Sequence, residues 1–460
     1  MGFRSLQIFL LHHPASVTDV GNDAFQGCGY LESIDIPASV ASIGEAAFYQ
    51  CTDLENVTFA NPSSLKTIGD SAFKECTSLP SITIPDSVTS VGKRAFRDCT
   101  ALSAIDIPAS VVHIGEYLFQ NCTGLKKATI HSPVTYINNG IFYGCENMTQ
   151  VNLPTTVKNI GYYAFYDCAA LQRLPSLSSV KNIGDNAFED CTGLSEISIP
   201  ASVTSIGKAA FAGCSRVSKI TVANDNPNFA DKDGVLYNKD LTELLVCSGQ
   251  KAGEFEVPFS VISIADRAFD TCYLLTKITL PSSVTKIGKR VFRGCERLEA
   301  IEVDENNPNL ISRSGVLYNE SMTELISYPQ GKEGSVFKLP STVKIIRAGA
   351  CWSNQNLTRV ELPGSVTTIE ELAFFYCKNL KTINIPSSVT GIGWKAFTYC
   401  KSLESITIPS SVAKIGSDAF ADCGSITIYG DPGSYAEQYA KDNDLTFAAI
   451  GADNVNDTAV

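Results

Sequence analysis

The sequence predicts an α/β repeat fold, a solenoid of about 15 repeats of about 23 residues each. Residues 34–51 read IDIPASVASIGEAAFYQC, and residues 406–423 read ITIPSSVAKIGSDAFADC, with many related copies between them. Each copy has apolar residues first two apart and then three to four apart, as in a strand followed by one turn of helix. Self-similarity at a period of about 20 to 50 residues is typical of a solenoid.

A cysteine column defines the repeats. Most neighbouring members are 23 residues apart, and Asn354 fills the one gap, since it stands 23 residues before Cys377. Fourteen cysteines and Asn354 therefore make 15 repeats. The cysteines of the column are Cys28, Cys51, Cys76, Cys99, Cys122, Cys145, Cys168, Cys191, Cys214, Cys272, Cys295, Cys377, Cys400 and Cys423.

Three short elements follow one another in each repeat, as residues 403–423 illustrate. Leu-x-x-Ile-x-Ile has the alternation of a strand with one buried face, and the next residue, Pro409, ends it. Ser-Val-x-x-Ile-Gly then predicts a second, shorter extended segment. Gly-x-x-Ala-Phe-x-x-Cys spaces its apolar residues as in one turn of helix.

The repeated Phe and Cys predict the core. Phe stands three residues before the Cys in almost every repeat, so a central example, Phe188, is expected to be fully buried. A cysteine that can be replaced by Asn354 indicates a reduced thiol that packs and donates a hydrogen bond to the turn. Disulfides between neighbouring repeats are the alternative, because adjacent strands bring Cα atoms within the range for a bridge. Cys247 and Cys351 lie outside the column, and a bridge between them is a further alternative.

The domain organisation predicted is a solenoid over 1–430, a C-terminal cap over 431–450 and a disordered tail over 451–460. Inserts at 224–256 and 304–338 share Asn-Pro-Asn and Gly-Val-Leu-Tyr-Asn. Each is expected to form a β-hairpin, whose role is either binding or a tolerated elaboration. In the cap, Ser434 and Glu437 form a predicted capping box for a helix over 435–441, which covers the last strand.

Composition excludes several classes of protein. A net charge of -12, from 36 basic and 48 acidic residues, argues against a general nucleic-acid surface. There is no run of 18 apolar residues, so we expect no membrane span. We expect a monomer, and the N-terminal 17 residues are expected not to be a signal peptide because His12 and His13 already belong to the first repeat.

Catalytic motifs are absent from the sequence. There is no HExxH, Cys-x-x-Cys, Gly-x-Ser-x-Gly or phosphate-binding glycine loop. Residues 231–234, DKDG, hint at a calcium loop, but Phe229 stands where the first ligand belongs. The sequence predicts no enzyme, no cofactor and no metal site.

Two sets of side chains that differ between repeats are candidate binding residues. Five residues after the Cys lies a basic row on the strands, which either meets an acidic ligand or pairs with nearby Glu302 and Glu361. Two residues before the Cys, aromatic residues of adjacent repeats are expected to stack and to bind a ligand, or simply to cover the surface. The basic row is Lys127, Arg173, Lys219, Lys277 and Arg359, and the aromatic residues are Tyr143, Tyr166, Trp352 and Phe375, with Tyr162, Tyr163, Tyr376 and Trp394 nearby.

The repeat Ile-x-Ile-Pro-x-Ser-Val-x-x-Ile-Gly-x-x-Ala-Phe-x-x-Cys-x-x-Leu resembles the BspA-type leucine-rich repeat family. The inserts and the ending GSYAEQYA at 433–440 resemble segments common in it. The resemblance implies a curved leucine-rich-repeat solenoid on a secreted or cell-surface protein that binds host proteins or other cells, with no catalytic residues. Our first hypothesis is therefore a non-enzymatic, adhesin-like protein with a protein ligand. The alternatives are a glycan-binding module and an intracellular scaffold.

Overall fold

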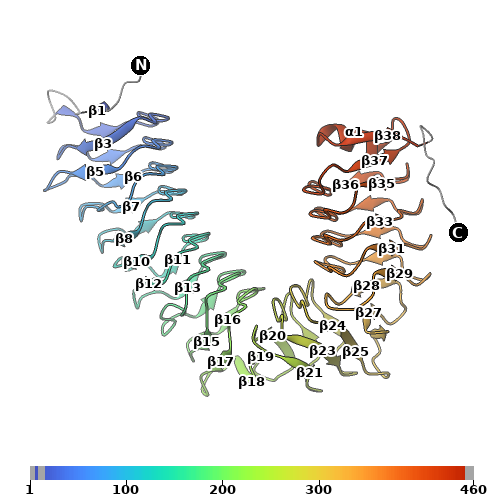
Figure 1. Cartoon of the computed structure of the whole chain (residues 1–460). Helices are drawn as coiled ribbons and strands as arrows, with labels where there is room; N and C mark the ends of the chain where they lie inside the picture. The colour runs from blue at the N-terminus through green and yellow to red at the C-terminus, as the bar shows by residue number, and fades with distance from the viewer. Residues whose placement is uncertain (1–5, 9–15, 451–460) are drawn as a thin grey trace. The chain divides into compact units, whose positions relative to one another are not determined.

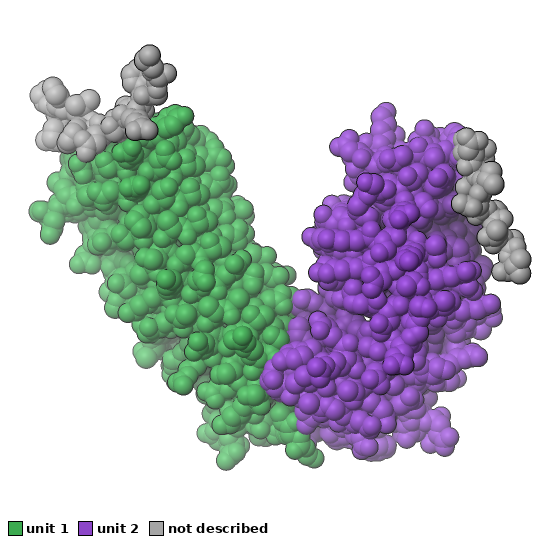
Figure 2. Space-filling view, in the orientation of Figure 1, with its two compact units in different colours: residues 1–240 green, residues 241–460 purple. Residues whose placement is uncertain are grey.

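The computed structural model describes residues 6–8 and 16–450. The chain forms two compact units, unit 1 over 1–240 and unit 2 over 241–460 (Figure 2). Each unit is a stack of coils in which strands recur at every turn, as predicted (Figure 1). The predicted tail over 451–460 lies outside the described residues.

Unit 1 contains two columns of parallel strands and one hairpin. The longer strands are β1 (Leu6–Ile8), β3 (Leu31–Ile36), β5 (Asn56–Phe59), β8 (Ala104–Ile107), β10 (Lys127–Ile130), β12 (Gln150–Asn152), β15 (Glu196–Ile199) and β17 (Lys219–Val222). The two-residue strands are β2 (Asp19–Val20), β4 (Ser42–Ile43), β6 (Thr67–Ile68), β7 (Ser90–Val91), β9 (His113–Ile114), β11 (Tyr136–Ile137), β13 (Asn159–Ile160), β14 (Asn182–Ile183) and β16 (Ser205–Ile206). The hairpin is β18 (Phe229–Lys232) with β19 (Val235–Asn238).

Unit 2 repeats this plan. The first column holds β21 (Gly253–Glu256), β23 (Leu275–Leu280), β25 (Ala300–Val303), β29 (Val336–Lys338), β31 (Arg359–Glu361), β33 (Thr382–Ile383), β35 (Ser405–Thr407), β37 (Thr427–Gly430) and β38 (Thr446–Ala449). The second holds β20 (Glu243–Cys247), β22 (Ser263–Ile264), β24 (Lys286–Ile287), β28 (Glu324–Ser327), β30 (Ile345–Ile346), β32 (Thr368–Ile369), β34 (Gly391–Ile392) and β36 (Lys414–Ile415). The remaining elements are β26 (Leu310–Arg313), β27 (Val316–Asn319) and helix α1 (Tyr435–Asp442).

Parallel pairing follows the repeat period. Lys127 pairs with Gln150, and Asn159 pairs with Asn182, each 23 residues further on. In β8 and β15, side chains alternate between exposed and buried, so one face of each strand enters the core. A Gly follows most of the two-residue strands and allows close stacking of the coils. A Cβ at Gly184 would lie 2.8 Å from the carbonyl carbon of Gly161.

The predicted turn of helix after this Gly is wrong. The segment forms hydrogen-bonded turns in which the residues five and one before the Cys have positive φ, for example Tyr163 (54°) and Asp167 (54°). Two left-handed residues in each turn prevent a continuous right-handed helix. Alternate N–H groups donate to the next coil instead, as from Phe165 N to Ala187 O at 2.8 Å. The turns are therefore joined between coils much as strands are.

The core is a stack of the repeated Phe and Cys. Phe188 is fully buried, as predicted, and its ring lies 5.0 Å from that of Phe165 and 5.4 Å from that of Phe211. The predicted thiol hydrogen bond is confirmed, since Cys191 Sγ donates to Phe165 O at 3.1 Å. Asn354 takes the same role, with Nδ2 donating to Pro329 O at 3.0 Å. All 16 cysteines are free, Cys247 and Cys351 among them.

The inserts add strands to the coils. In the second insert, β27 and β28 pair antiparallel, which confirms the predicted hairpin, and β26 is an additional strand on the other side of β27. β28 then pairs in parallel with β30, so this insert joins the solenoid sheet. In the first insert, β18 and β19 form a hairpin around Asp233 and Gly234.

The C-terminal segment contains the predicted helix, α1, but not the predicted way of covering the last strand. β38, which follows the helix, pairs in parallel with β37 and covers its edge. The predicted capping box is not formed: Glu437 accepts a hydrogen bond at 2.6 Å from Gly433 N, one residue before the N-cap, and the Ser434 hydroxyl makes no capping bond. Tyr439 packs edge-on to Phe420 and joins α1 to the Phe stack.

Candidate functional site

The basic row in unit 1 lies on an exposed strand face. Lys127 and Lys219 are the first residues of β10 and β17, and both side chains are exposed. Arg173 is also exposed, in a segment that makes no strand. Lys219 pairs in register with Glu196, which places one acidic residue beside the row.

The basic row in unit 2 is paired with acidic side chains of the same face. Lys277 Nζ lies 3.0 Å from Glu254 Oε2, and Arg359 Nη2 lies 3.0 Å from Glu361 Oε1. The hydrogen bond that Lys277 donates to Glu254 raises the pKa of Lys277. The predicted pairing with Glu361 is confirmed, whereas Lys277 bonds to Glu254 and not to Glu302. This part of the row is therefore neutralised within the sheet.

The aromatic residues of unit 1 form a tyrosine triad, defined as Tyr143, Tyr163 and Tyr166. The rings of Tyr143 and Tyr166 stack at 4.5 Å and 15°, as predicted from their spacing. Tyr163 meets Tyr166 edge-on at 5.7 Å and Tyr143 at 6.3 Å. Tyr162 is exposed and takes no part in these ring contacts. The triad is partly exposed and rigid, because each tyrosine comes from a hydrogen-bonded turn.

The aromatic residues of unit 2 form a larger cluster. Trp352 stacks on Phe375 at 4.4 Å, as predicted. Phe375 contacts Tyr376 and Tyr399, and the two tyrosines meet edge-on at 5.4 Å. Tyr399 was not foreseen, although its place directly before the Cys matches that of Tyr376. Cations of the same unit cover several of these rings, with Lys378 Nζ 4.1 Å from the centre of Tyr376 and Lys395 Nζ 4.8 Å from that of Trp394.

Carboxylates surround the tyrosine triad, which the sequence analysis missed. Glu189 continues the column of Tyr143 and Tyr166 and is only 5% exposed. Asn186 Nδ2 donates a hydrogen bond to its Oε2. Burial together with Glu146 and Asp190 raises the pKa of Asp167 to about 6. Burial, Asp190 and Glu189 raise the pKa of Tyr166 as well.

Unit 2 has a buried ion cluster in the corresponding turns. Asp270 Oδ2 accepts a hydrogen bond from Arg267 Nε at 2.7 Å, and Arg267 Nη2 forms an ion pair with the same oxygen at 2.6 Å. Arg293 Nε lies 3.5 Å from Asp270 Oδ1. The guanidinium of Arg293 also lies 5.2 Å from the centre of the Trp352 ring. Arg293 is therefore close to both a carboxylate and an aromatic ring.

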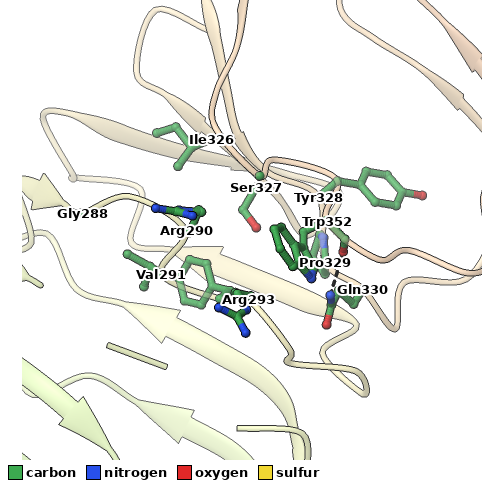
Figure 3. A pocket seen from close by; sticks show the side chains of 12 residues that line it. Gly288, Arg290, Val291, Arg293, Ile326, Ser327, Tyr328, Pro329, Gln330 and Trp352 are labelled. Atoms are coloured by element: carbon green, nitrogen blue, oxygen red, sulfur yellow. Dashed lines mark hydrogen bonds between the residues drawn. The ribbon is translucent and has the colours of Figure 1, made fainter. Parts of the chain in front are cut away.

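A small cavity lies beside this cluster (Figure 3). Arg290 and Arg293 face the segment 326–330, and Gln330 Nε2 donates to Trp352 O at 2.7 Å. The cavity measures about 20 Å³. That volume has room for one water molecule. Gln330 Oε1 and Arg290 Nε are buried polar atoms next to it without a protein partner, so the cavity is of the size and polarity of a water site.

Neither a metal-binding cluster nor a membrane-spanning helix occurs among the described residues. Over 6–8 and 16–450, no group of three His, Cys, Asp or Glu side chains is arranged to hold a metal ion. Within the same ranges, no helix combines the length and the apolar character needed to cross a bilayer.

The repeat sequence matches the family described as BspA type leucine rich repeat region. The matched residues are 2–126, 59–172, 112–232, 246–333 and 330–434, which together span most of the chain. The chain belongs to this family. The predicted resemblance is thereby confirmed. No curated protein matches the chain.

Solved structures similar to the chain include three bacterial leucine-rich repeat proteins. A leucine rich cell surface protein of Faecalibacterium prausnitzii is 29% identical over 92% of this chain and 85% of its own, with a TM-score of 0.40. A protein of Eubacterium ventriosum is 26% identical over 60% and 67%, with a TM-score of 0.41. One of Bacteroides ovatus is 25% identical over 94% and 88%, with a TM-score of 0.39. The family assignment rests on the repeat match and not on these scores.

Proposed function

We propose that this BspA-type solenoid is a non-enzymatic, adhesin-like protein of the cell surface or secreted fraction, which binds a protein ligand. The observation that carries the proposal is the strand face of unit 1. Its parallel strands, paired in register, present exposed side chains, Lys127 and Lys219 among them. A partner that spans several coils gains many modest contacts at once, which needs no pocket or catalytic group.

The basic residues Lys127, Arg173 and Lys219 are the proposed contact residues on this face. They favour an acidic patch on the ligand, because complementary charge accelerates association and excludes wrong partners. The counterparts in unit 2, Lys277 and Arg359, already bond to Glu254 and Glu361. We therefore assign the charged contact to unit 1.

The test is direct binding of the purified chain to immobilised extracellular matrix and serum proteins, with an array of neutral glycans in parallel. The proposal expects saturable binding to at least one protein and a decrease in affinity as the salt concentration rises. Saturable binding to neutral glycans alone, without salt dependence, would favour the glycan-binding alternative.

A further inference from the structure

The tyrosine triad and the ion cluster of unit 2 occupy the same place in the repeat. Tyr143, Tyr166 and Glu189 stand two residues before their cysteines, as do Asp270 and Arg293. Both sets therefore project from equivalent turns. Both combine aromatic rings with carboxylates, but only unit 2 supplies a guanidinium between them.

Arg293 shows which group such a surface holds. Its guanidinium carbon lies 5.2 Å from the centre of the Trp352 ring, and its Nε lies 3.5 Å from Asp270 Oδ1. A planar guanidinium suits this position because it stacks on aromatic faces and donates hydrogen bonds in its own plane.

In unit 1 the rings are present, but the charges beside them are negative. Asp167 lies in the turn of Tyr166, and Asp190 is one coil further on. Among the described residues, no Lys or Arg stacks over Tyr143 or Tyr166. The carboxylates of Glu146 and Asp190 act on Asp167 in the direction that disfavours its charge. A cation placed on this surface would relieve that repulsion and cover aromatic area.

We propose that the tyrosine triad, with Asp167 and Asp190, is a second interaction surface that binds an arginine side chain of a protein partner. The guanidinium would stack on the tyrosine rings and donate to the carboxylates, the two kinds of group that also lie close to Arg293 in unit 2. The inference rests on the proposed function only in that the ligand is a protein. It uses different residues from the basic row and the opposite charge.

The experiment measures fluorescence anisotropy of a labelled Gly/Ser peptide that carries several arginines, with the full chain. The same peptide with citrulline, which is neutral and nearly isosteric, is the ligand control. We expect the citrulline peptide to bind about tenfold more weakly, which corresponds to about 1.4 kcal/mol. Equal affinity of the two peptides would overturn the proposal.

Two pairs of variants locate the site. The double variant Asp167→Asn, Asp190→Asn keeps the shape of the surface but removes both charges. We expect the affinity for the arginine peptide to fall about tenfold, within the range of charge-assisted contacts. Asp418→Asn with Asp422→Asn removes the same charge from two exposed, left-handed turn positions in unit 2. This control is expected to leave affinity unchanged. If both double variants lose the same affinity, the peptide is attracted only by the net negative charge of the chain, and the proposed site is contradicted.

Tyr166→Ala tests the aromatic contribution and separates a glycan ligand. We expect it to weaken binding of the arginine peptide several-fold, since the guanidinium loses the aromatic face that attracts a cation. A neutral glycan is the alternative ligand. If the chain binds such a glycan, and this binding is lost in Tyr166→Ala but kept in the Asp167→Asn, Asp190→Asn variant, the tyrosines stack on a sugar and the proposal is overturned. If the arginine peptide fails to bind, the tyrosine triad is not an arginine-binding surface. The proposed function still stands in that case, provided that a protein ligand shows salt-dependent binding through Lys127, Arg173 and Lys219.

Discussion

The guanidinium of Arg293 lies 5.2 Å from the centre of the Trp352 ring. The two residues stand in equivalent positions of their turns, each two residues before the column occupied by Cys295 or Asn354. The contact joins a cation of unit 2 to an aromatic residue of the same unit. The equivalent turns of unit 1 place Glu189 beside Tyr166 instead, so the two units differ in the charge that accompanies their aromatic residues.

Asp167 is expected to reduce the stability of the free protein at neutral pH. Its pKa is raised from 3.8 to about 6 by burial and by Glu146 and Asp190. The folded state therefore favours the protonated acid, and its stability falls as pH rises from about 4 to 6. We predict that Asp167→Asn increases the free energy of unfolding by about 1 kcal/mol at neutral pH, after allowance for solvent screening.

The measurement is urea unfolding of the parent and Asp167→Asn proteins at neutral pH and near pH 4. Most of the gain should disappear at the lower pH, where Asp167 of the parent is protonated in the folded state and nearly half protonated in the unfolded state. The tyrosines Tyr143 and Tyr166 and the thiols of Cys168 and Cys191 also face Asp167. Their pKa values lie above this range, so they do not obscure the transition. A loss of stability at neutral pH would contradict the assignment.

For the buried ion cluster, we predict that removing one charged partner destabilises the fold much more than replacing both partners. Asp270→Ala leaves Arg267, only 7% exposed, without its carboxylate. Removing one partner of a buried ion pair costs about 3–5 kcal/mol. Arg267→Leu with Asp270→Ala installs the residues that other repeats have in these columns, Leu372 and Ala212. This double variant should lose much less stability in urea than Asp270→Ala alone, and an equal loss would be evidence against a costly unpaired charge.

Phe188 provides the test of the core. Its ring is fully buried between those of Phe165 and Phe211. Phe188→Ala should lower the free energy of unfolding by about 3–5 kcal/mol. Tyr162→Ala, at a side chain 53% exposed, is the control and should change it by less than about 0.5 kcal/mol. Similar effects of both changes would be inconsistent with a stacked Phe core.

The thiol column predicts a difference between native and denatured protein. Burial raises the pKa of Cys377 to about 12 and that of Cys191 well above its ordinary value. The thiolate is the reactive form. A thiol reagent should therefore react slowly with the native chain and with nearly all 16 cysteines in denaturant without reductant. Recovery of fewer than half of the thiols would indicate disulfides.

The strand columns and the Phe stack could be predicted because the repeat period alone aligns equivalent residues. The same 23-residue spacing predicted that Tyr143 stacks on Tyr166 and that Trp352 stacks on Phe375. The turn conformation could not be predicted, since left-handed φ occurs at Tyr163, Asp167 and other residue types that carry no signal for it.

Contacts within a turn were also beyond the sequence, because Arg267 bonds to Asp270 inside one turn and this depends on the unforeseen backbone geometry. The contact of Lys277 with Glu254 follows the repeat period, since the two residues are 23 residues apart and pair in register on β23 and β21. It was missed because Glu254 was assigned to the insert and not to a strand of the repeat. The carboxylates around the tyrosine triad, such as Asp167 and Asp190, stand directly before the Cys. The predicted aromatic surface was based on the residues two positions before the Cys, so these carboxylates were missed.

Binding by the strand face of unit 1 is the central claim, and charge reversal tests it most directly. Lys127→Glu, Arg173→Glu and Lys219→Glu together are compared with Lys66→Glu, Lys158→Glu and Lys181→Glu. The control residues are exposed lysines of one other column in unit 1, and their replacement changes the net charge equally. The measurement is the affinity for a protein ligand as a function of salt concentration. The account predicts that the first variant binds more weakly at low salt and with reduced salt dependence, while the control resembles the parent. Affinity equal to that of the parent at low salt in the first variant would contradict it.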